Sequence, residues 1–224
     1  MIKAIIFDMD GVLVDTEPVH CASYVQTFQD HGVKIEDNHF YDHWTKKGGN
    51  LQQFVDQKGL NVDIDLLRSQ KRTKYQDQLK ESLPIIAGSK EVVQSLSLIY
   101  PLALATSSYA KEASLILELM EIKSNFKTIV TCEDVKNIKP DPECFLLASK
   151  RLGIDPKNAL VIEDAQKGVI AAKRAGMRVI AIPNQYTFDH DFSLADRIIA
   201  SINELTPQLI ESLQNSVLAR DICH

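Results

Sequence analysis

Short runs of apolar residues recur along the chain and predict buried β-strands. The first run, residues 2–7, ends at an Asp-rich turn that contains a glycine. Continuous apolar character without alternation is typical of a strand that is covered on both faces of its sheet. Later runs of the same kind occupy residues 102–106, 128–131, 159–162, 179–182 and, more weakly, 197–200. The chain is therefore expected to form one buried sheet.

Between these runs, apolar residues recur at helical spacing. The segments with this spacing are residues 89–99, 110–120, 141–152, 165–175 and 203–214. For the segment 141–152, Asp141 is the expected N-cap, Pro142 the first-turn residue and Gly153 the stop. Strands that alternate with helices need right-handed crossovers, which predicts an α/β fold with a doubly wound parallel sheet.

The stretch 16–83 interrupts this alternation and separates the first two strands by much more than one crossover requires. A helix is expected from Pro18 to about His31, followed by polar helical segments near Asp37, Leu51 and Asp63. We interpret residues 16–83 as an inserted small α-helical domain, and residues 1–15 and 84–224 as the core. The two linkers of the insert form a natural hinge over the turn that follows the first strand.

Composition and charge narrow the class of protein. The 224 residues are 45% hydrophobic and 25% charged, which is ordinary for a folded globular chain and excludes disorder. A net charge of −5 gives no basic excess for a nucleic acid. No apolar run approaches the ~20 residues that cross a bilayer, and the four cysteines lack zinc-ligand spacing. We expect a cytoplasmic protein with reduced thiols and with neither nucleic acid nor membrane as a partner.

Polar residues gather where the predicted strands end. In a doubly wound sheet, ligands bind beyond the carboxyl ends of the strands. The residues at these ends are Asp8, Asp10 and Gly11, then Thr106, Ser107 and Ser108, then Lys139, and finally Glu163 and Asp164. Carboxylates that face one another from two strands repel unless a cation lies between them, and oxygen ligands suit Mg²⁺, which also binds phosphate. The sequence thus predicts a Mg²⁺ site for a phosphorylated substrate.

Each of these residues has a chemical role in phosphoryl transfer and a plainer alternative. Asp8 could bind the metal and also attack phosphorus as the nucleophile. Asp10 could first act as a general acid and later as a general base. Thr106 and Lys139 would hold the phosphoryl oxygens. Alternatively, Asp8 and Asp10 could be ordinary turn residues and Lys139 a solvated loop residue. Asp164 could cap the helix that follows it. One of the two serines at 107 and 108 is expected only to cap the helix near Tyr109.

The order of these residues resembles a known family. Residues 7–18 read FDMDGVLVDTEP, and they are followed by Thr106-Ser107, by residues 139–142 (KPDP) and by residues 161–164 (VIED). These are similar to the four motifs of the haloacid dehalogenase-like hydrolase superfamily, and the insert resembles its C1 cap. The resemblance implies that Asp8 is the nucleophile and Asp10 the acid/base. It also implies that Asp8, Glu163, Asp164 and the Asp10 backbone carbonyl bind Mg²⁺.

Within this superfamily the chain resembles β-phosphoglucomutases, phosphoglycolate phosphatases and small sugar-phosphate phosphatases. Thr16, His20 and Lys47 match cap positions of the mutases, but Leu51 replaces the arginine expected four residues after the lysine. This replacement argues against a mutase, because holding a second phosphate favours arginine. Structural roles stay open for His20 and for Lys47, which lies in a basic pair with Lys46. The predicted substrate-binding set is Gly11, Thr16, His20, Lys47, Ser107 and Ser108.

The leading interpretation is a Mg²⁺-dependent phosphatase that hydrolyses a small phosphorylated metabolite through an aspartyl phosphate. A sugar phosphate, phosphoglycolate or a nucleotide would suit it, and a phosphosugar mutase is the alternative. A haloacid dehalogenase would need neither Asp10 nor the acidic pair. A phospho-accepting receiver would lack the insert, and a non-catalytic phosphate-binding protein should have lost one of the motif residues. We expect a monomer.

Overall fold

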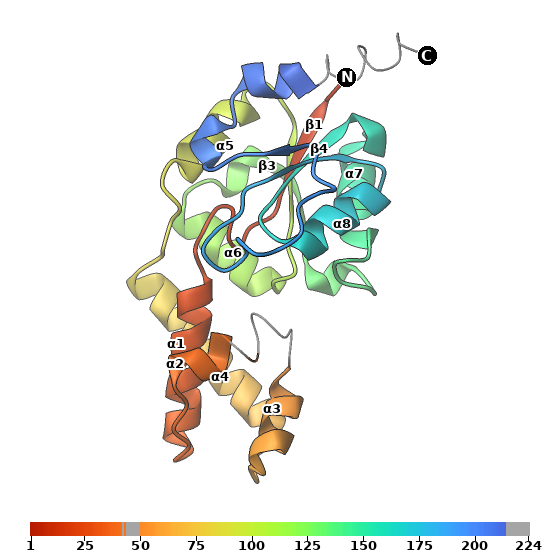
Figure 1. Ribbon diagram of the computed structural model, residues 1–224. Helices are drawn as coiled ribbons and strands as arrows, with labels where there is room; N and C mark the ends of the chain where they lie inside the picture. The colour runs from red at the N-terminus through yellow and green to blue at the C-terminus, as the bar shows by residue number, and fades with distance from the viewer. Residues whose placement is uncertain (42, 44–49, 214–224) are drawn as a thin grey trace. The chain divides into compact units, whose positions relative to one another are not determined.

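The computed structural model describes residues 1–41, 43 and 50–213. The chain divides into two compact units, one formed by Met1–Val14 with Ile85–His224 and the other by Asp15–Pro84. The position of one unit relative to the other is not determined, so each is described by itself (Figure 1). The assignment of the second unit as a cap stays a prediction.

The first unit is built on a parallel sheet. Within the described residues its six strands have the spatial order β3-β2-β1-β4-β5-β6. Each neighbouring pair is parallel, which confirms the predicted doubly wound α/β fold. The strands are β1 (Ala4–Phe7), β2 (Leu102–Ala105), β3 (Phe126–Val130), β4 (Ala159–Glu163), β5 (Arg178–Ala181) and β6 (Arg197–Ile198). This order changes direction between β1 and β4, and such a switch point is where sheets of this type bind ligands.

Helices cover both faces of the sheet, as buried strands require. In Figure 1, α7 (Glu143–Leu152) and α8 (Gln166–Arg174) lie on one side, and α5 (Ser89–Ser97) and α6 (Ala110–Leu119) lie on the other. Phe145 of α7 and Val169 of α8 belong to one fully buried cluster with Ile6 and Val161 of the central strands. Short 3-10 turns complete the unit: η2 (Lys123–Asn125), η3 (Cys132–Asp134), η4 (Pro156–Asn158) and η5 (Ile202–Glu204).

Two predicted helix boundaries are corrected. The helix expected to start at Asp141 begins at Glu143 with Pro142 as its N-cap, although the Asp141 side chain still accepts a hydrogen bond from the Glu143 amide at 3.0 Å. Its end at Gly153, in the left-handed conformation at φ 69°, is as predicted. The expected helix 203–214 is replaced by η5 and a separate helix at 207–213. Pro207 explains this break, because a proline is tolerated in a first helical turn but not in a helix interior.

The second unit is helical, as its sequence predicts. Its helices are α1 (Glu17–Asp30), α2 (Asp37–Phe40), α3 (Leu51–Lys58) and α4 (Ile64–Glu81). Phe28, Phe54 and Leu67 are buried together, which gives the unit an apolar cluster of its own. Asn50 caps α3 through a capping box, and the Asp63 side chain accepts from two amides at the start of α4.

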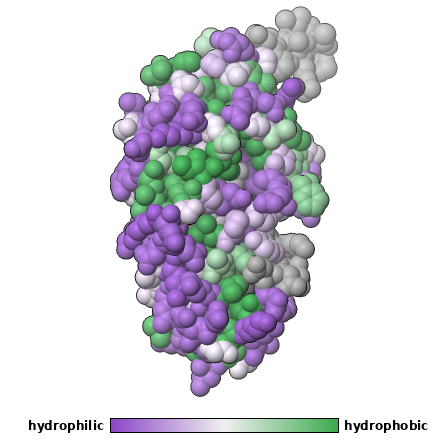
Figure 2. Space-filling view, turned by 90° about the vertical axis from the view of Figure 1, so that its left-hand side faces the viewer, coloured by the Kyte–Doolittle hydropathy of each residue, from purple (hydrophilic) through white to green (hydrophobic). Residues whose placement is uncertain are grey.

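Among the described residues, none of the helices has the length and apolar character that a membrane crossing would need. The face drawn in Figure 2 carries hydrophilic side chains over much of its area, with apolar ones in patches between them. Large apolar side chains are exposed at scattered positions such as Leu98 and Phe188. Because apolar atoms form over half of an ordinary protein surface, these positions alone indicate no binding surface.

Candidate active site

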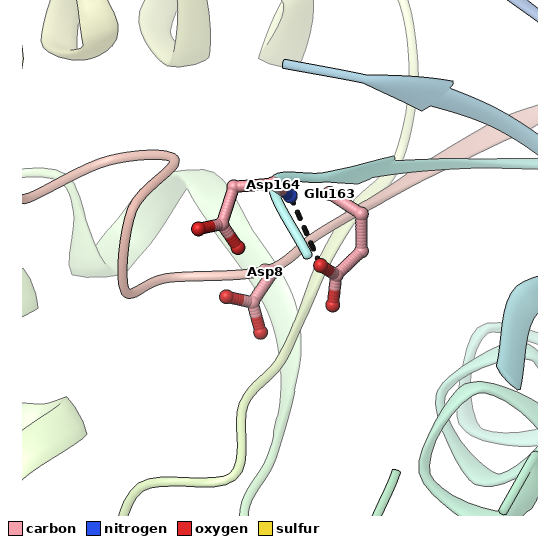
Figure 3. Close-up of side chains that lie close together, drawn as sticks. All are labelled: Asp8, Glu163 and Asp164. Atoms are coloured by element: carbon pink, nitrogen blue, oxygen red, sulfur yellow. Dashed lines mark hydrogen bonds between the residues drawn. The ribbon is translucent and has the colours of Figure 1, made fainter. Parts of the chain in front are cut away.

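Three buried carboxylates meet at the switch point of the sheet. Asp8 follows β1, Glu163 ends β4 and Asp164 follows it, and each offers an oxygen within 4.8 Å of the others. Figure 3 shows the Asp8 and Asp164 carboxyl groups facing each other, with Glu163 beside them. The hydrogen bond from the Asp8 amide to the Ile162 carbonyl, 2.9 Å long, ties the two strand ends together. The parallel register therefore brings acids separated by more than 150 residues into one cluster.

Lys139 is the cation of this cluster. It lies between β3 and α7, and its side chain is 2% exposed. Its ammonium group donates to Asp8 Oδ1 at 2.5 Å, to Glu163 Oε1 at 2.7 Å and to the Ala105 carbonyl at 3.0 Å. The Phe145 ring lies beneath it, with its centroid 4.7 Å from Nζ. A buried ammonium with three acceptors is fixed in place, so the solvated-loop alternative for Lys139 is wrong.

The charges in this cluster perturb one another. Burial, opposed by Lys139 and reinforced by the neighbouring acids, raises the pKa of Asp8 to about 7. Burial and the negative charges of Glu163 and Asp8 hold the pKa of Asp164 well above its usual range. The pKa of Lys139 is raised because Asp8 and Glu163 outweigh the effect of its burial. One ammonium is thus too little positive charge for three ionised carboxylates, and the cluster favours an additional cation.

Glu163 is held by the backbone of the two residues that precede α8. Its Oε2 accepts from the Asp164 and Ala165 amides, both at 3.0 Å, while Oε1 accepts from Lys139. Gly168 leaves the space for this carboxylate, because a Cβ at that position would lie 1.8 Å from Glu163 Oε1. Sequence reasoning missed Gly168, whose backbone is not in the left-handed region.

Replacing Gly168 by alanine tests this arrangement. In a helix interior this change normally stabilises by about 1 kcal/mol, whereas crowding of a packed site costs about 1–3 kcal/mol. We expect the clash to dominate and Gly168→Ala to unfold at lower denaturant concentration than the parent chain. Lys167→Ala, at an exposed position of the same helix, is the control. An unchanged or higher stability of Gly168→Ala would show that Glu163 can move away at no cost.

Asp10 is held by the segment that follows β2. Its Oδ2 accepts from the Ser108 hydroxyl at 2.7 Å and from the Thr106 hydroxyl at 3.2 Å. The Ser108 amide in turn donates to Thr106 Oγ1 at 3.0 Å. The two hydroxyl residues therefore orient the candidate acid/base.

The predicted capping of α6 by a serine is wrong for Ser108, whose hydroxyl bonds Asp10. The N-cap residue of α6 is Tyr109, whose side chain makes no capping bond. Glu133 serves instead, because its carboxylate accepts from the Ala110 amide at 2.7 Å. Ser107 is exposed beside these residues.

The predicted cap residues do not share this cluster's unit. Thr16 is buried at the start of α1. The His20 ring stacks on Tyr75 with centroids 4.2 Å apart, and its Nδ1 lies 2.6 Å from Lys71 Nζ. Burial and the Lys71 charge lower the pKa of His20 well below its usual value, which favours a neutral imidazole that accepts from Lys71. Lys46 and Lys47 lie outside the described residues, so the roles predicted for them stay predictions.

Asn184 is a site residue that sequence reasoning missed. It lies in the loop after β5, and its side-chain amide donates to Asp164 Oδ2 at 2.8 Å. Gly11, at φ 82°, faces this pair, and a Cβ there would lie 2.2 Å from Asp164 Oδ2 and 2.8 Å from Asn184 Nδ2. Gly11 thus makes room for Asp164 as well as supplying a backbone conformation that favours glycine. Extending the strand-end rule to the fifth strand would have pointed to Asn184.

The donor set fits a divalent cation of the Mg²⁺ type. All three acids offer oxygen, which Mg²⁺ prefers, and no cysteine or histidine joins the cluster among the described residues. Burial first, and the neighbouring acids after it, raise the pKa values of Asp8 and Asp164, and a bound cation would favour the ionised form of both. The residues that would hold the ion are Asp8 and Asp164, with Glu163 beside them.

Known proteins match this chain over most of its length. A family model described as haloacid dehalogenase-like hydrolase matches residues 5–182. YhcW of Bacillus subtilis is 32% identical over 96% of this chain and 99% of its own. A phosphorylated carbohydrates phosphatase of Thermotoga maritima is 34% identical over 80% of this chain and 83% of its own. The crystal structure of CbbY from Rhodobacter sphaeroides in complex with phosphate has a TM-score of 0.80 at 25% identity, covering 92% of this chain and 96% of that one.

Proposed function

This chain belongs to the haloacid dehalogenase-like hydrolases, and we propose that it is a Mg²⁺-dependent phosphatase that cleaves a small phosphorylated metabolite through an aspartyl phosphate. The observation that carries the proposal is the position of Asp8 at the switch point, in contact with Lys139 and close to two further buried acids. Asp10, oriented by Thr106 and Ser108, follows Asp8 by two residues. These are the parts that phosphoryl transfer needs.

We assign three groups to Mg²⁺ as ligands: the Asp8 and Asp164 carboxylates and the Asp10 backbone carbonyl. The Glu163 carboxylate lies beside them. When bound, the ion neutralises negative charge on the phosphoryl group and on the carboxylates. Lys139 adds a fixed positive charge to the same place, and it keeps one Asp8 oxygen oriented through its hydrogen bond.

In the first step, the free carboxylate oxygen of Asp8 attacks phosphorus. A bond from this oxygen to phosphorus forms while the bond from phosphorus to the ester oxygen breaks. Asp10, in its protonated form, donates its proton to the departing alcohol oxygen. The Ser108 and Thr106 hydroxyls donate to Asp10 Oδ2 and hold this carboxyl group in place for the transfer.

In the second step, a water molecule attacks the phosphorus of phospho-Asp8. Asp10, now ionised, takes a proton from that water, and the bond between phosphorus and Asp8 breaks to release inorganic phosphate. Asp10 ends protonated and Asp8 ends as a carboxylate, so the cycle closes without another reactant. One carboxyl group serves both steps because the same proton moves in opposite directions.

Hydrolysis is favoured over a mutase reaction by Leu51. A mutase must hold a second phosphate, and the position at which the resemblance calls for an arginine carries Leu51. This side chain is 4% exposed and packs in the apolar cluster with Phe28 and Phe54. Such a residue offers neither charge nor hydrogen bond to an anion.

The substrate class that we propose is a phosphorylated sugar or polyol. The name of the Thermotoga maritima relative, a phosphorylated carbohydrates phosphatase, supports this choice. The test is phosphate release with Mg²⁺ over a panel of sugar phosphates, phosphoglycolate and nucleotides, with conversion of β-glucose 1-phosphate followed in parallel. Release from the sugar phosphates supports the proposal. Formation of glucose 6-phosphate that depends on a bisphosphate primer would establish a mutase instead, and release from nucleotides alone would replace the substrate class.

Binding of Mg²⁺ should depend on pH with a definite sign. The pKa of Asp8 is raised from 3.8 to about 7, so the folded state holds this proton more tightly than the unfolded chain. This contribution to stability is complete below pH 3.8 and is lost as pH rises through about 7. Mg²⁺ competes with that proton. The rise in Tm caused by Mg²⁺ should therefore be larger at pH 8 than at pH 6, which a thermal-shift series measures with Na⁺ as the control cation. Equal rises at both values would contradict proton competition at Asp8.

A further inference from the structure

We propose that Asn184 is a positioning residue that fixes the Asp164 carboxylate for the cation, an inference that rests on the proposed Mg²⁺ site. Asn184 lies in the loop after β5, outside the four motifs that identify the family by sequence. Its amide nitrogen Nδ2 donates to Asp164 Oδ2 at 2.8 Å. An Asn side chain in this place touches a ligand of the ion without being one itself.

The orientation of the Asn184 amide is determined by its own loop. Its oxygen Oδ1 accepts from the Tyr186 amide at 2.9 Å, which only the oxygen end of the side chain can do. Two further hydrogen bonds fix the backbone of this loop. The backbone N–H of Asn184 donates to Thr187 Oγ1 at 3.0 Å, and the backbone N–H of Thr187 donates to the Asn184 backbone carbonyl at 3.1 Å. The NH₂ group is thus directed at Asp164 before any ligand arrives.

This bond removes a freedom that an aspartate otherwise has. Rotation about the last bond of an Asp side chain is broad rather than confined to sharp minima, so the two carboxylate oxygens are not placed by the backbone alone. Holding Oδ2 at a fixed donor sets the plane of the carboxylate and the direction of both oxygens. Gly11 leaves the space that this arrangement needs, because a Cβ there would lie 2.2 Å from Asp164 Oδ2 and 2.8 Å from Asn184 Nδ2.

Hydrogen bonds of this kind, one step removed from a metal, contribute to affinity. Losing such a partner typically weakens metal binding by about 10–100-fold. We expect Asn184→Ala to raise the Kd for Mg²⁺ about 10-fold, while kcat at saturating Mg²⁺ falls much less. The loss would then appear mainly in the Mg²⁺ concentration that half-activates the enzyme.

The experiment compares Mg²⁺ binding by titration calorimetry and Mg²⁺ activation of phosphate release in four proteins: parent, Asn184→Ala, Asn184→Ser and Asn125→Ala. Serine retains an acceptor for the loop amide, so this variant remains informative if alanine unfolds the loop. Asn125, whose amide donates to Ser97 Oγ at 2.8 Å in the same unit, is the matched control.

Weaker Mg²⁺ binding in both Asn184 variants, with the Asn125 variant unchanged, supports the inference. A merely structural role predicts a lower Tm with unaltered Mg²⁺ affinity, and that result overturns it. If the parent chain itself binds no Mg²⁺, the proposed metal site fails, and the inference fails with it. If the parent binds and the Asn184 variants bind equally well, only the inference fails.

Discussion

Replacing Asp8 by asparagine should abolish turnover while the fold remains intact. An amide oxygen is a poor nucleophile, and loss of a nucleophile that forms a covalent intermediate costs on the order of 10⁴-fold or more in kcat. The change is isosteric. It also removes one negative charge from a buried cluster in which burial and neighbouring acids already raise the pKa of Asp8. We therefore expect stability to hold or to rise in the absence of Mg²⁺.

Three measurements check this prediction. Phosphate release gives the loss of kcat, circular dichroism confirms the fold, and rapid acid quenching with labelled substrate shows whether a phosphoenzyme forms. Asp155→Asn is the matched control, since Asp155 is exposed and caps η4 through the Lys157 amide, a bond that asparagine also accepts. Retained phosphate release in Asp8→Asn would remove Asp8 as the nucleophile, and the aspartyl-phosphate mechanism with it.

The fold and the centre of the site could be predicted because both depend on local patterns. Apolar runs predict buried strands, and the residues that follow those strands must share one edge of a parallel sheet. This rule predicts from the sequence alone that Asp8, Lys139 and Asp164 lie close together. Contacts between strand ends follow from the topology of the sheet. The order of the short motifs along the chain is therefore enough to predict which residues meet at the centre of the site.

Other parts of the site depend on details that no pattern carries. The need for glycine at 168 arises from the position of the Glu163 carboxylate, 1.8 Å from a hypothetical Cβ, rather than from backbone conformation. The Ser108 hydroxyl bonds Asp10, although a serine before a helix predicts a cap. Here a distant carboxylate competes with the local amides for the hydroxyl, and tertiary contact decides. Asn184 differs from these two residues, because it follows β5 and the strand-end rule points to it once the rule is extended to that strand.

Lys139→Met is expected to weaken both the fold and the reaction. The ammonium group is buried among Asp8, Glu163 and the Ala105 carbonyl. Removing one partner of a buried ion pair costs about 3–5 kcal/mol, because the remaining charges stay buried without compensation. Methionine keeps a similar length and apolar stem, so packing against Phe145 is retained. Loss of a group that stabilises transition-state charge costs a further 10²–10³-fold in kcat, as an order of magnitude.

The stability deficit of this variant should depend on pH and on Mg²⁺. Lys139 lowers the pKa of Asp8 against the effect of burial, so without it Asp8 holds its proton to higher pH. The neutral form is the stable one in the variant, and its contribution is lost as pH rises through the folded pKa. The deficit relative to the parent should therefore be larger at pH 8 than at pH 5, and Mg²⁺ should recover part of it by replacing the missing positive charge.

Denaturant unfolding at the two pH values, with and without Mg²⁺, measures this deficit, and Lys157→Met at an exposed position is the control. A deficit that is equal at both pH values and insensitive to Mg²⁺ would mean that Lys139 supports the fold through packing and hydrogen bonds rather than through its charge.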